Sequence, residues 1–335
     1  MRTVLPVLAW MSLVQLACGD STSTTTMPTT GPAGFPQAQS VLKALNENPA
    51  PLVERIEGGE INWTTGQVFA VGEGKATGVS GQQIDMAKRA ARLVAARNAV
   101  YLLSGIRTGP GGRFKNIREG SITADAVVQH FEEASDSFDL ATRTATVRLK
   151  MPLYGVKGMV TLGGLELARP RTEAKPPVTK PGEPKVIIID ARGSGFTPCM
   201  LPRITRPSGA SVFDASQTSF DPRTADRPPV IYVSMPRHDE LTPSRRNSPT
   251  PAGPDGPAII YKAQKSPAKS PGSLVLADED VDDMTGYVAT GGLMSTGRVV
   301  VVADSPSEPA SPTPTAAPSP TPTPKAGPTT SITVD

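Results

Sequence analysis

The sequence predicts an α+β fold: a small strand-helix-strand-strand domain, then a second small domain of α/β type, with disordered tethers. The main observation is a long helical pattern at Gln82–Leu103, preceded by a strand-like run at Ile61–Gly74. Two further strand-like runs follow the helix, at Ser121–Phe131 and Thr142–Leu153. A continuous β-branched run at Val186–Ile189 opens the second domain. This order of elements favours one helix packed on an antiparallel or mixed sheet in the first domain.

The helix at Gln82–Leu103 is predicted from the spacing of its apolar residues, which form a broad stripe opposite a charged face. Ser80 is placed to cap its start and Gly105 to end it, and its many alanines allow close approach to a sheet. We interpret the charged face as solvated, not as an anion or nucleic-acid patch. The stripe comprises Ile84, Ala87, Ala91, Val94, the polar Asn98 and Leu102, widened by Met86, Ala90, Leu93 and Tyr101; the charged face comprises Asp85, Lys88, Arg89 and Arg92.

The flanking strands are predicted from alternation and β-branched content. In the run before the helix, Val68 and Ala70 share one face of the strand. Residues 142–153 alternate with a clean period of two, and Asp136–Asp139 is expected to supply the bend before them. The glycines at 72, 74, 78 and 81 fit neither known phosphate-binding spacing, so no nucleotide loop is expected.

These elements resemble a known bacterial domain. The residues that carry the resemblance are the pattern W-x-x-G-x-x-x-A-x-G from Trp63, the helix AKRAARLVAARNAVYLL and the closing strand VRLKMPLYG. They are similar to the N-terminal domain of flagellar assembly protein T and related small bacterial surface lipoproteins, over about residues 63–158. The resemblance implies an exported, envelope-associated domain that binds other proteins, and it implies no catalytic residues.

The N-terminus is typical of an export signal. A basic start precedes an apolar run at Val4–Ala17, which is short for a membrane span, and Leu16-Ala17-Cys18-Gly19 follows. A small residue before Cys18 resembles a bacterial lipobox, although Gln15 departs from the apolar preference at its position. We therefore expect a signal peptide at 1–17 and a lipidated Cys18 at the start of a disordered tether, 18–50. The alternative is ordinary cleavage after Gly19, which gives a soluble periplasmic or secreted protein.

The rest of the chain divides by composition. We expect the first domain at 51–160, a Pro/Lys linker at 169–184, the second domain at 185–304 with a disordered insertion at 236–257, and a Pro/Thr-rich disordered tail at 305–335. The acidic segment Asp278–Asp283 is expected to open a short helix. Short strand-like runs recur in the second domain, at Val230–Val233, Ala258–Tyr261, Ser273–Leu276 and Arg298–Ala303. The opening I-I-D-A-R-G and the closing R-V-V-V-V resemble a C-terminal domain of uncharacterised bacterial envelope proteins, which brings no activity with it.

Composition excludes several functions. The chain has 36 Pro, 31 Gly and only 4% aromatic residues, so much of it cannot belong to a core. A net charge of +3 and few aromatics argue against a nucleic-acid partner. Cys18 and Cys199 are the two cysteines, and Cys199 is expected to be a small buried residue. The two histidines are far apart, the acidic segment lacks calcium-loop spacing, and no catalytic triad or metal motif occurs, so no cofactor is expected.

Asp190 and Arg192 form the most site-like pair, because they end a strand where α/β sheets often bind ligands. The alternative is a structural ion pair that holds the strand end to the loop around Pro202 and Arg203. We therefore predict a non-enzymatic cell-envelope lipoprotein, a protein-binding or assembly module of the outer membrane or periplasm. Its partners would be envelope or surface-appendage proteins, with the membrane reached through Cys18. The alternative is a small-ligand binder or enzyme that uses Asp190 and Arg192.

Overall fold

The structure is a computed structural model that describes residues 49–114, 129–162, 186–215, 228–236, 241–243, 258–289 and 298–305. Among these residues it contains three helices and thirteen strands, so the protein has an α+β fold as predicted. The predicted signal peptide, Cys18, the linker 169–184 and nearly all of the tail lie outside the described residues.

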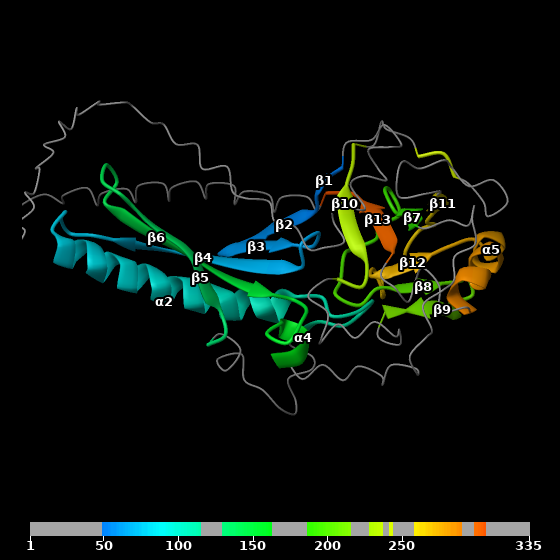
Figure 1. Ribbon diagram of the computed structural model, residues 1–335, viewed down its shortest axis with the longest axis horizontal. Coiled ribbons are helices and arrows are strands. Elements are labelled where there is room, and N and C mark those ends of the chain that lie inside the picture. Colours follow the sequence, from blue (N-terminus) through cyan, green and yellow to red (C-terminus); the bar gives the residue numbers. More distant parts are fainter. Residues whose placement is uncertain are drawn as a thin grey trace, which may run out of the picture. The chain divides into compact units, whose positions relative to one another are not determined.

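The first sheet is antiparallel and has the order β2-β3-β4-β6-β5. Helix α2 (Gly81–Gly105) lies along this sheet and packs mainly on its two central long strands (Figure 1). Helix α2 follows β4 and precedes β6, as predicted, but the strand between them, β5, lies at Glu132–Asp139 and not at 121–131. The strands are β2 (Val53–Ile56), β3 (Gly59–Asn62), β4 (Gln67–Lys75), β5 (Glu132–Asp139) and β6 (Thr144–Pro152).

Helix α2 begins as predicted, because Ser80 and Gln83 form a reciprocal capping box at its first turn. Its inner face is built from alanines and ends in two buried leucines, and β4 meets it with Gly72 and Gly74. A Cβ atom at Gly72 would lie 2.2 Å from the backbone oxygen of Ala91 and the backbone nitrogen of Ala95. The helix and strand are therefore in backbone contact. The buried residues are Ala87, Ala91, Ala95, Ala99, Leu102 and Leu103.

The predicted apolar stripe of α2 is wrong in part. Met86, Leu93 and Tyr101 do not face the sheet, and 62%, 74% and 60% of their surface is exposed. Val94 is also exposed, by 40%. The physical reason is the close approach of α2 to β4, which leaves room for alanine side chains but not for larger ones.

The predicted bend at Asp136–Asp139 is also wrong. These residues lie inside β5, and the chain turns after it, at 140–143, where Arg143 takes a positive φ of 51°. Two ion pairs to α2 stabilise the acidic strand: Asp136 pairs with Lys88 at 2.6 Å and Glu133 pairs with Arg92 at 2.5 Å. The predicted strand at 121–131 precedes β5, and its residues 121–128 lie outside the described part of the chain.

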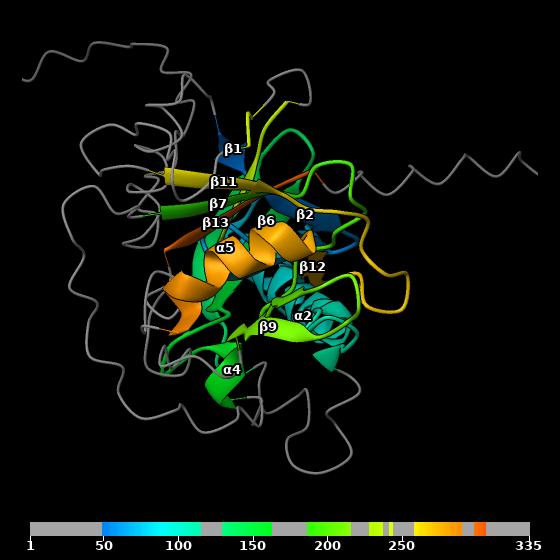
Figure 2. The same ribbon diagram turned by 90° about the vertical axis from the view of Figure 1, so that its right-hand side faces the viewer.

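The second sheet has the order β1-β10-β13-β7-β11, in which the last four strands run parallel. Figure 2 shows β7, β11 and β13 side by side. Two separate hydrophobic clusters bury alternate residues of these strands, as expected for continuous β-branched runs in a parallel sheet. The predicted runs became β7 (Val186–Asp190), β10 (Ile231–Ser234), β11 (Ala258–Lys262) and β13 (Val299–Ala303).

A third, three-stranded sheet completes the second half, in the order β12-β8-β9. Of its strands only β12 (Ser273–Val275) was predicted, while β8 (Arg203–Thr205) and β9 (Ser211–Asp214) were missed. Helix α5 (Asp278–Ala289) follows β12, and the short α4 (Met159–Leu162) follows β6. The acidic segment thus opens a helix, as predicted.

Residues before and within the first sheet also contact the second sheet. Strand β1 (Ala50–Pro51) precedes the first sheet in the chain but pairs antiparallel with β10 of the second sheet. The hydroxyl of Thr64 donates to the Tyr232 carbonyl at 2.5 Å, and the Trp63 and Tyr232 rings meet edge to face at 6.2 Å. Within the predicted insertion 236–257, Leu241 is buried in the core of the second sheet, and residues 237–240 and 244–257 are not described.

Candidate functional site

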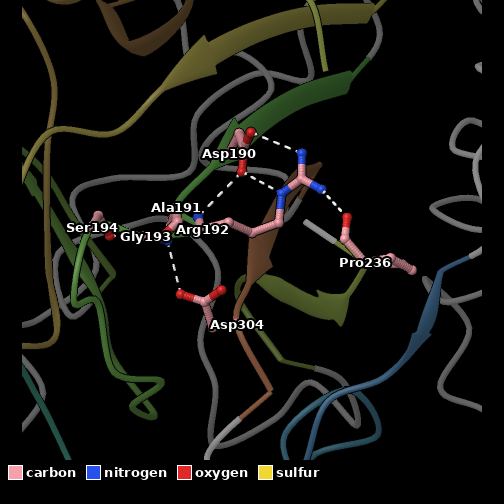
Figure 3. Close-up of polar contacts among 7 residues, drawn as sticks. All are labelled: Asp190, Ala191, Arg192, Gly193, Ser194, Pro236 and Asp304. Carbon is pink, nitrogen blue, oxygen red and sulfur yellow. Dashed lines mark hydrogen bonds and ion pairs between the residues drawn. The ribbon is translucent and has the colours of Figure 1, made fainter. Parts of the chain in front are cut away.

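Asp190 and Arg192 lie where β7 ends, at the carboxyl edge of the parallel sheet (Figure 3). The run of β-branched residues before Asp190 keeps the chain extended between two parallel neighbours, β13 and β11. The strand stops at Asp190, and a turn with positive φ at Gly193 and Gly195 follows. This position, beyond the carboxyl ends of parallel strands, is one where ligands often bind in α/β sheets.

The two side chains bind each other through both carboxylate oxygens. The Nε of Arg192 donates to Oδ1 of Asp190 at 2.8 Å, and Nη2 donates to Oδ2 at 3.0 Å. The backbone N–H of Arg192 also donates to Oδ1, at 3.1 Å. Only 6% of the Arg192 side chain and 5% of the Asp190 side chain are exposed. This is a bidentate, buried ion pair whose carboxylate already accepts three hydrogen bonds.

The remaining contacts of the pair hold neighbouring loops. Nη1 of Arg192 donates to the Pro236 carbonyl at 2.6 Å, which joins the end of β7 to the end of β10. The N–H of Gly193 donates to Oδ2 of Asp304 at 2.8 Å, which joins it to the end of β13. The Ser194 hydroxyl donates to the Ala191 carbonyl at 2.6 Å and closes the turn. The loop that we expected the pair to hold, around Pro202 and Arg203, is not the one that it contacts.

Arg203 instead has its own partner, because its guanidinium pairs with Asp214 of β9 at 2.6 Å. Likewise, His130 lies in the turn before β5 of the first sheet, and no hydrogen bond joins it to the Asp190–Arg192 pair among the described residues. Asp304 is the carboxylate that the structure brings to this edge, through the Gly193 N–H. The Asp190–Arg192 pair and the neighbouring Gly193 N–H therefore connect the ends of β7, β10 and β13.

The acidic start of α5 is engaged with an arginine. Arg206, which follows β8, donates to Asp278 at 2.9 Å and to Asp282 at 2.5 Å, and the two carboxylates raise its pKa. Asp283 accepts a hydrogen bond from the Tyr261 hydroxyl at 2.8 Å. Within the described ranges, no group of three or more potential ligands is arranged to hold a metal ion. These carboxylates stabilise the positive end of the helix dipole and fix α5 to β8 and β11.

A buried polar cluster around Trp63 was not predicted. Glu54 on β2 accepts a hydrogen bond from Nε1 of Trp63 at 2.8 Å and forms a bidentate pair with Arg107, just after α2. The Arg107 guanidinium lies 5.4 Å from the Trp63 ring centre, and its Nε donates to the Pro198 carbonyl at 2.7 Å. The cluster thus ties the first sheet to the segment after β7. The one available sequence signal was that a core tryptophan needs an acceptor for its N–H.

Cys199 is fully buried, as expected, and lies beside this cluster. The Tyr232 hydroxyl donates to the Cys199 carbonyl at 2.8 Å, and the thiol itself faces the Gly272 carbonyl at 3.8 Å. Burial raises the pKa of the thiol to about 12. A thiol with so high a pKa is almost entirely protonated near neutrality, and the protonated form is a poor nucleophile.

Cys199 should therefore resist alkylation by iodoacetamide in the folded protein at about pH 8 and react only after unfolding in guanidinium. Mass spectrometry of the alkylated chain measures this directly, and the unfolded sample is the positive control. In unfolded protein, one alkylation per chain is expected for a chain that is lipidated on Cys18 or cleaved after Gly19, and two for a chain that keeps a free Cys18. Rapid modification of Cys199 in the folded state would contradict the buried, protonated thiol.

A comparison with family models finds a match at residues 186–305, to the family described as the second domain of Treponema pallidum Tp0624. The matched segment begins with β7 and ends just after β13, so it covers the parallel sheet, the three-stranded sheet and α5. The second half of the chain is thus similar to a bacterial domain. The match does not extend to residues 63–158, so the resemblance to flagellar assembly protein T stays a prediction.

No curated protein sequence matches the chain. In the part of the chain that the structure describes, no helix combines the length and the apolar content that a membrane span requires.

Proposed function

We propose that this protein is a non-enzymatic cell-envelope lipoprotein, anchored through Cys18, whose folded part binds other envelope proteins. In this proposal the first sheet and α2 form a module of the flagellar assembly protein T type, and the second half is a bacterial domain. Its place would be the outer membrane, on the periplasmic or surface side.

The non-enzymatic part of the proposal rests on the hydrogen bonds that Asp190 and Arg192 make within the protein. The carboxylate accepts three hydrogen bonds from Arg192 itself, and the guanidinium also holds the Pro236 carbonyl. A ligand that used Asp190 or Arg192 would have to break a buried bidentate ion pair, which is costly. The geometry favours a brace between strand ends over a ligand site.

The competing proposal is a small-ligand binder that uses the same pair. One observation favours it, since the pair lies beyond the carboxyl ends of parallel strands with the exposed Gly193 beside it. The two proposals differ in what an Arg192 substitution does. A brace predicts loss of stability, whereas a ligand site predicts a stable protein that has lost binding.

The anchoring part rests on the sequence Leu16-Ala17-Cys18-Gly19 after the apolar run, and intact mass tests it. Protein isolated from bacterial membranes should carry the mass of a diacyl or triacyl group on Cys18. The Cys18→Ala variant should lack this mass and leave the membrane fraction. An unmodified chain that starts at Asp20 would overturn the proposal and show a soluble exported protein.

The binding part is tested by crosslinking in intact cells. A photo-reactive phenylalanine analogue at the exposed position Val156 or Leu140 should give discrete adducts with an envelope protein. The same analogue at the buried Phe213, where the core already holds a phenyl ring, should give none. An adduct pattern that is equal at exposed and buried positions would contradict specific binding.

A further inference from the structure

The outer face of α2, defined here as Met86, Arg89, Leu93, Arg97 and Tyr101, combines exposed apolar side chains with arginines. Its members recur at intervals of three and four residues, so they share one side of the helix. The three apolar side chains are the ones that the close contact with β4 excludes from the core, and each is exposed by 60% or more. The fold thus displays a row of large apolar side chains that its own core does not use.

The charge on this face is positive: it carries two arginines, and the one acidic residue of α2, Asp85, lies one helical turn before Arg89. On the flank of α2, Lys88 and Arg92 are neutralised by Asp136 and Glu133 of β5. Arg89 and Arg97 are both exposed, and neither forms an ion pair with another of the described residues. The outer face of α2 is therefore apolar and positive at the same time.

A second copy of the chain is a poor occupant for this face. An antiparallel two-fold pairing centred on Leu93 places Arg89 of one copy opposite Arg97 of the other, since each is four residues from the centre. A parallel pairing sets each arginine near its own counterpart. Both arrangements bring like charges together, so charge complementarity calls for an anionic surface.

We propose that the outer face of α2 lies against an anionic lipid surface. Leucine, methionine and tyrosine would enter the boundary between acyl chains and headgroups, while the arginines reach the lipid phosphates. The proposal rests on the anchoring at Cys18 proposed above. The chain from Cys18 to β1 has a length for which a flexible linker spans roughly 30 Å, so α2 would stay within reach of the membrane.

Lipid is favoured over an acidic protein for two reasons. A stable protein interface uses about 20–30 residues from each partner, and a single row along one helix supplies far fewer. A lipid surface needs no such area, because the anchor already keeps the face at high effective concentration next to the membrane. A weak, amphipathic contact is then sufficient to orient the protein.

Quenching of tryptophan fluorescence by bromine-labelled lipids tests the proposal on the full-length protein. The Leu93→Trp variant, anchored through Cys18, is reconstituted in vesicles of phosphatidylcholine alone or mixed with phosphatidylglycerol, and the wild-type signal from Trp63 is subtracted. The matched control is Val156→Trp, at a position that is 67% exposed and lies outside α2. Strong quenching is expected for Leu93→Trp in the anionic vesicles, with little quenching in the control.

Charge reversal provides the second arm. Each arginine near an anionic surface is expected to favour the docked state by a factor of about five. Adding Arg89→Glu and Arg97→Glu to the Leu93→Trp variant should therefore abolish the quenching in anionic vesicles. Quenching that is equal for Leu93→Trp and Val156→Trp, or unchanged by the charge reversal, would overturn the proposal and leave the face for an acidic protein.

Flotation of the same vesicles separates this inference from the proposed anchor. If the protein floats with neutral vesicles but shows no quenching at position 93, the anchor proposal is supported and the docking face is rejected. If the protein floats and is quenched only with anionic vesicles, the docking face is supported and the anchor proposal is rejected.

Discussion

Replacing Arg192 by alanine should lower the free energy of unfolding by about 3–5 kcal/mol, the range found when one partner of a buried ion pair is removed. The variant leaves the Asp190 carboxylate buried, with 5% of its side chain exposed and no counter-charge from Arg192. It also frees the Pro236 carbonyl and so loosens the end of β10. Urea unfolding followed by circular dichroism measures the change.

The matched control is Arg92→Ala. Arg92 pairs with Glu133 at 2.5 Å, but 52% of its side chain and 34% of the Glu133 side chain are exposed, so its loss should cost less than about 1 kcal/mol. A double variant with Asp190→Leu and Arg192→Met should recover part of the stability lost in Arg192→Ala, because no unpaired charge remains. If Arg192→Ala were as stable as Arg92→Ala, the brace would be rejected and the ligand-binding proposal would gain.

The strands of the parallel sheet could be predicted from the sequence because their side chains are buried on both faces. Continuous β-branched runs such as Val186–Ile189 and Val299–Val302 are typical of strands that are covered on both faces of a parallel sheet. Strands β8 and β9 were missed because each is short and places its residues in mixed environments, from exposed Ser211 to buried Phe213. Their pairing depends on tertiary contacts that are not visible in a short window of sequence.

The acidic strand β5 shows where local propensity misleads. Aspartate and serine favour turns, so Asp136–Asp139 was interpreted as a bend. The strand forms because β6 supplies a ladder of backbone hydrogen bonds and α2 supplies Lys88 and Arg92 as partners. The side-chain hydrogen bond and charge of Lys88 lower the pKa of Asp136, so this support requires the ionised carboxylate and is lost as the pH falls through that lowered pKa.

The position of Asp190 and Arg192 at the end of a strand could be predicted from the sequence, but their contacts could not. That Asp190 ends a strand follows from the run before it. That Arg192 reaches Pro236, and that Glu54, Trp63 and Arg107 form a cluster, depends on segments far apart in the chain meeting in space. Hydrophobic periodicity records which residues are buried and carries no information on which distant partner they meet.

Gly72→Ala should severely destabilise the first sheet, with a loss of about 3 kcal/mol or more in the free energy of unfolding. The added Cβ would lie 2.2 Å from backbone atoms of both Ala91 and Ala95, and a backbone cannot move aside as a flexible side chain can. To accept it, α2 must move away from β4 along the whole alanine face. Thermal unfolding followed by circular dichroism measures the loss.

The control for Gly72→Ala is Gly81→Ala, at the first residue of α2, where an added Cβ meets no atom within 4 Å. That variant should be neutral or slightly stabilising, since alanine favours the helix over glycine. The same close contact that makes Gly72 irreplaceable is what expels Met86, Leu93 and Tyr101 from the core. If Gly72→Ala were as stable as Gly81→Ala, α2 would not be in backbone contact with β4, and the exposure of these three side chains would lose its cause.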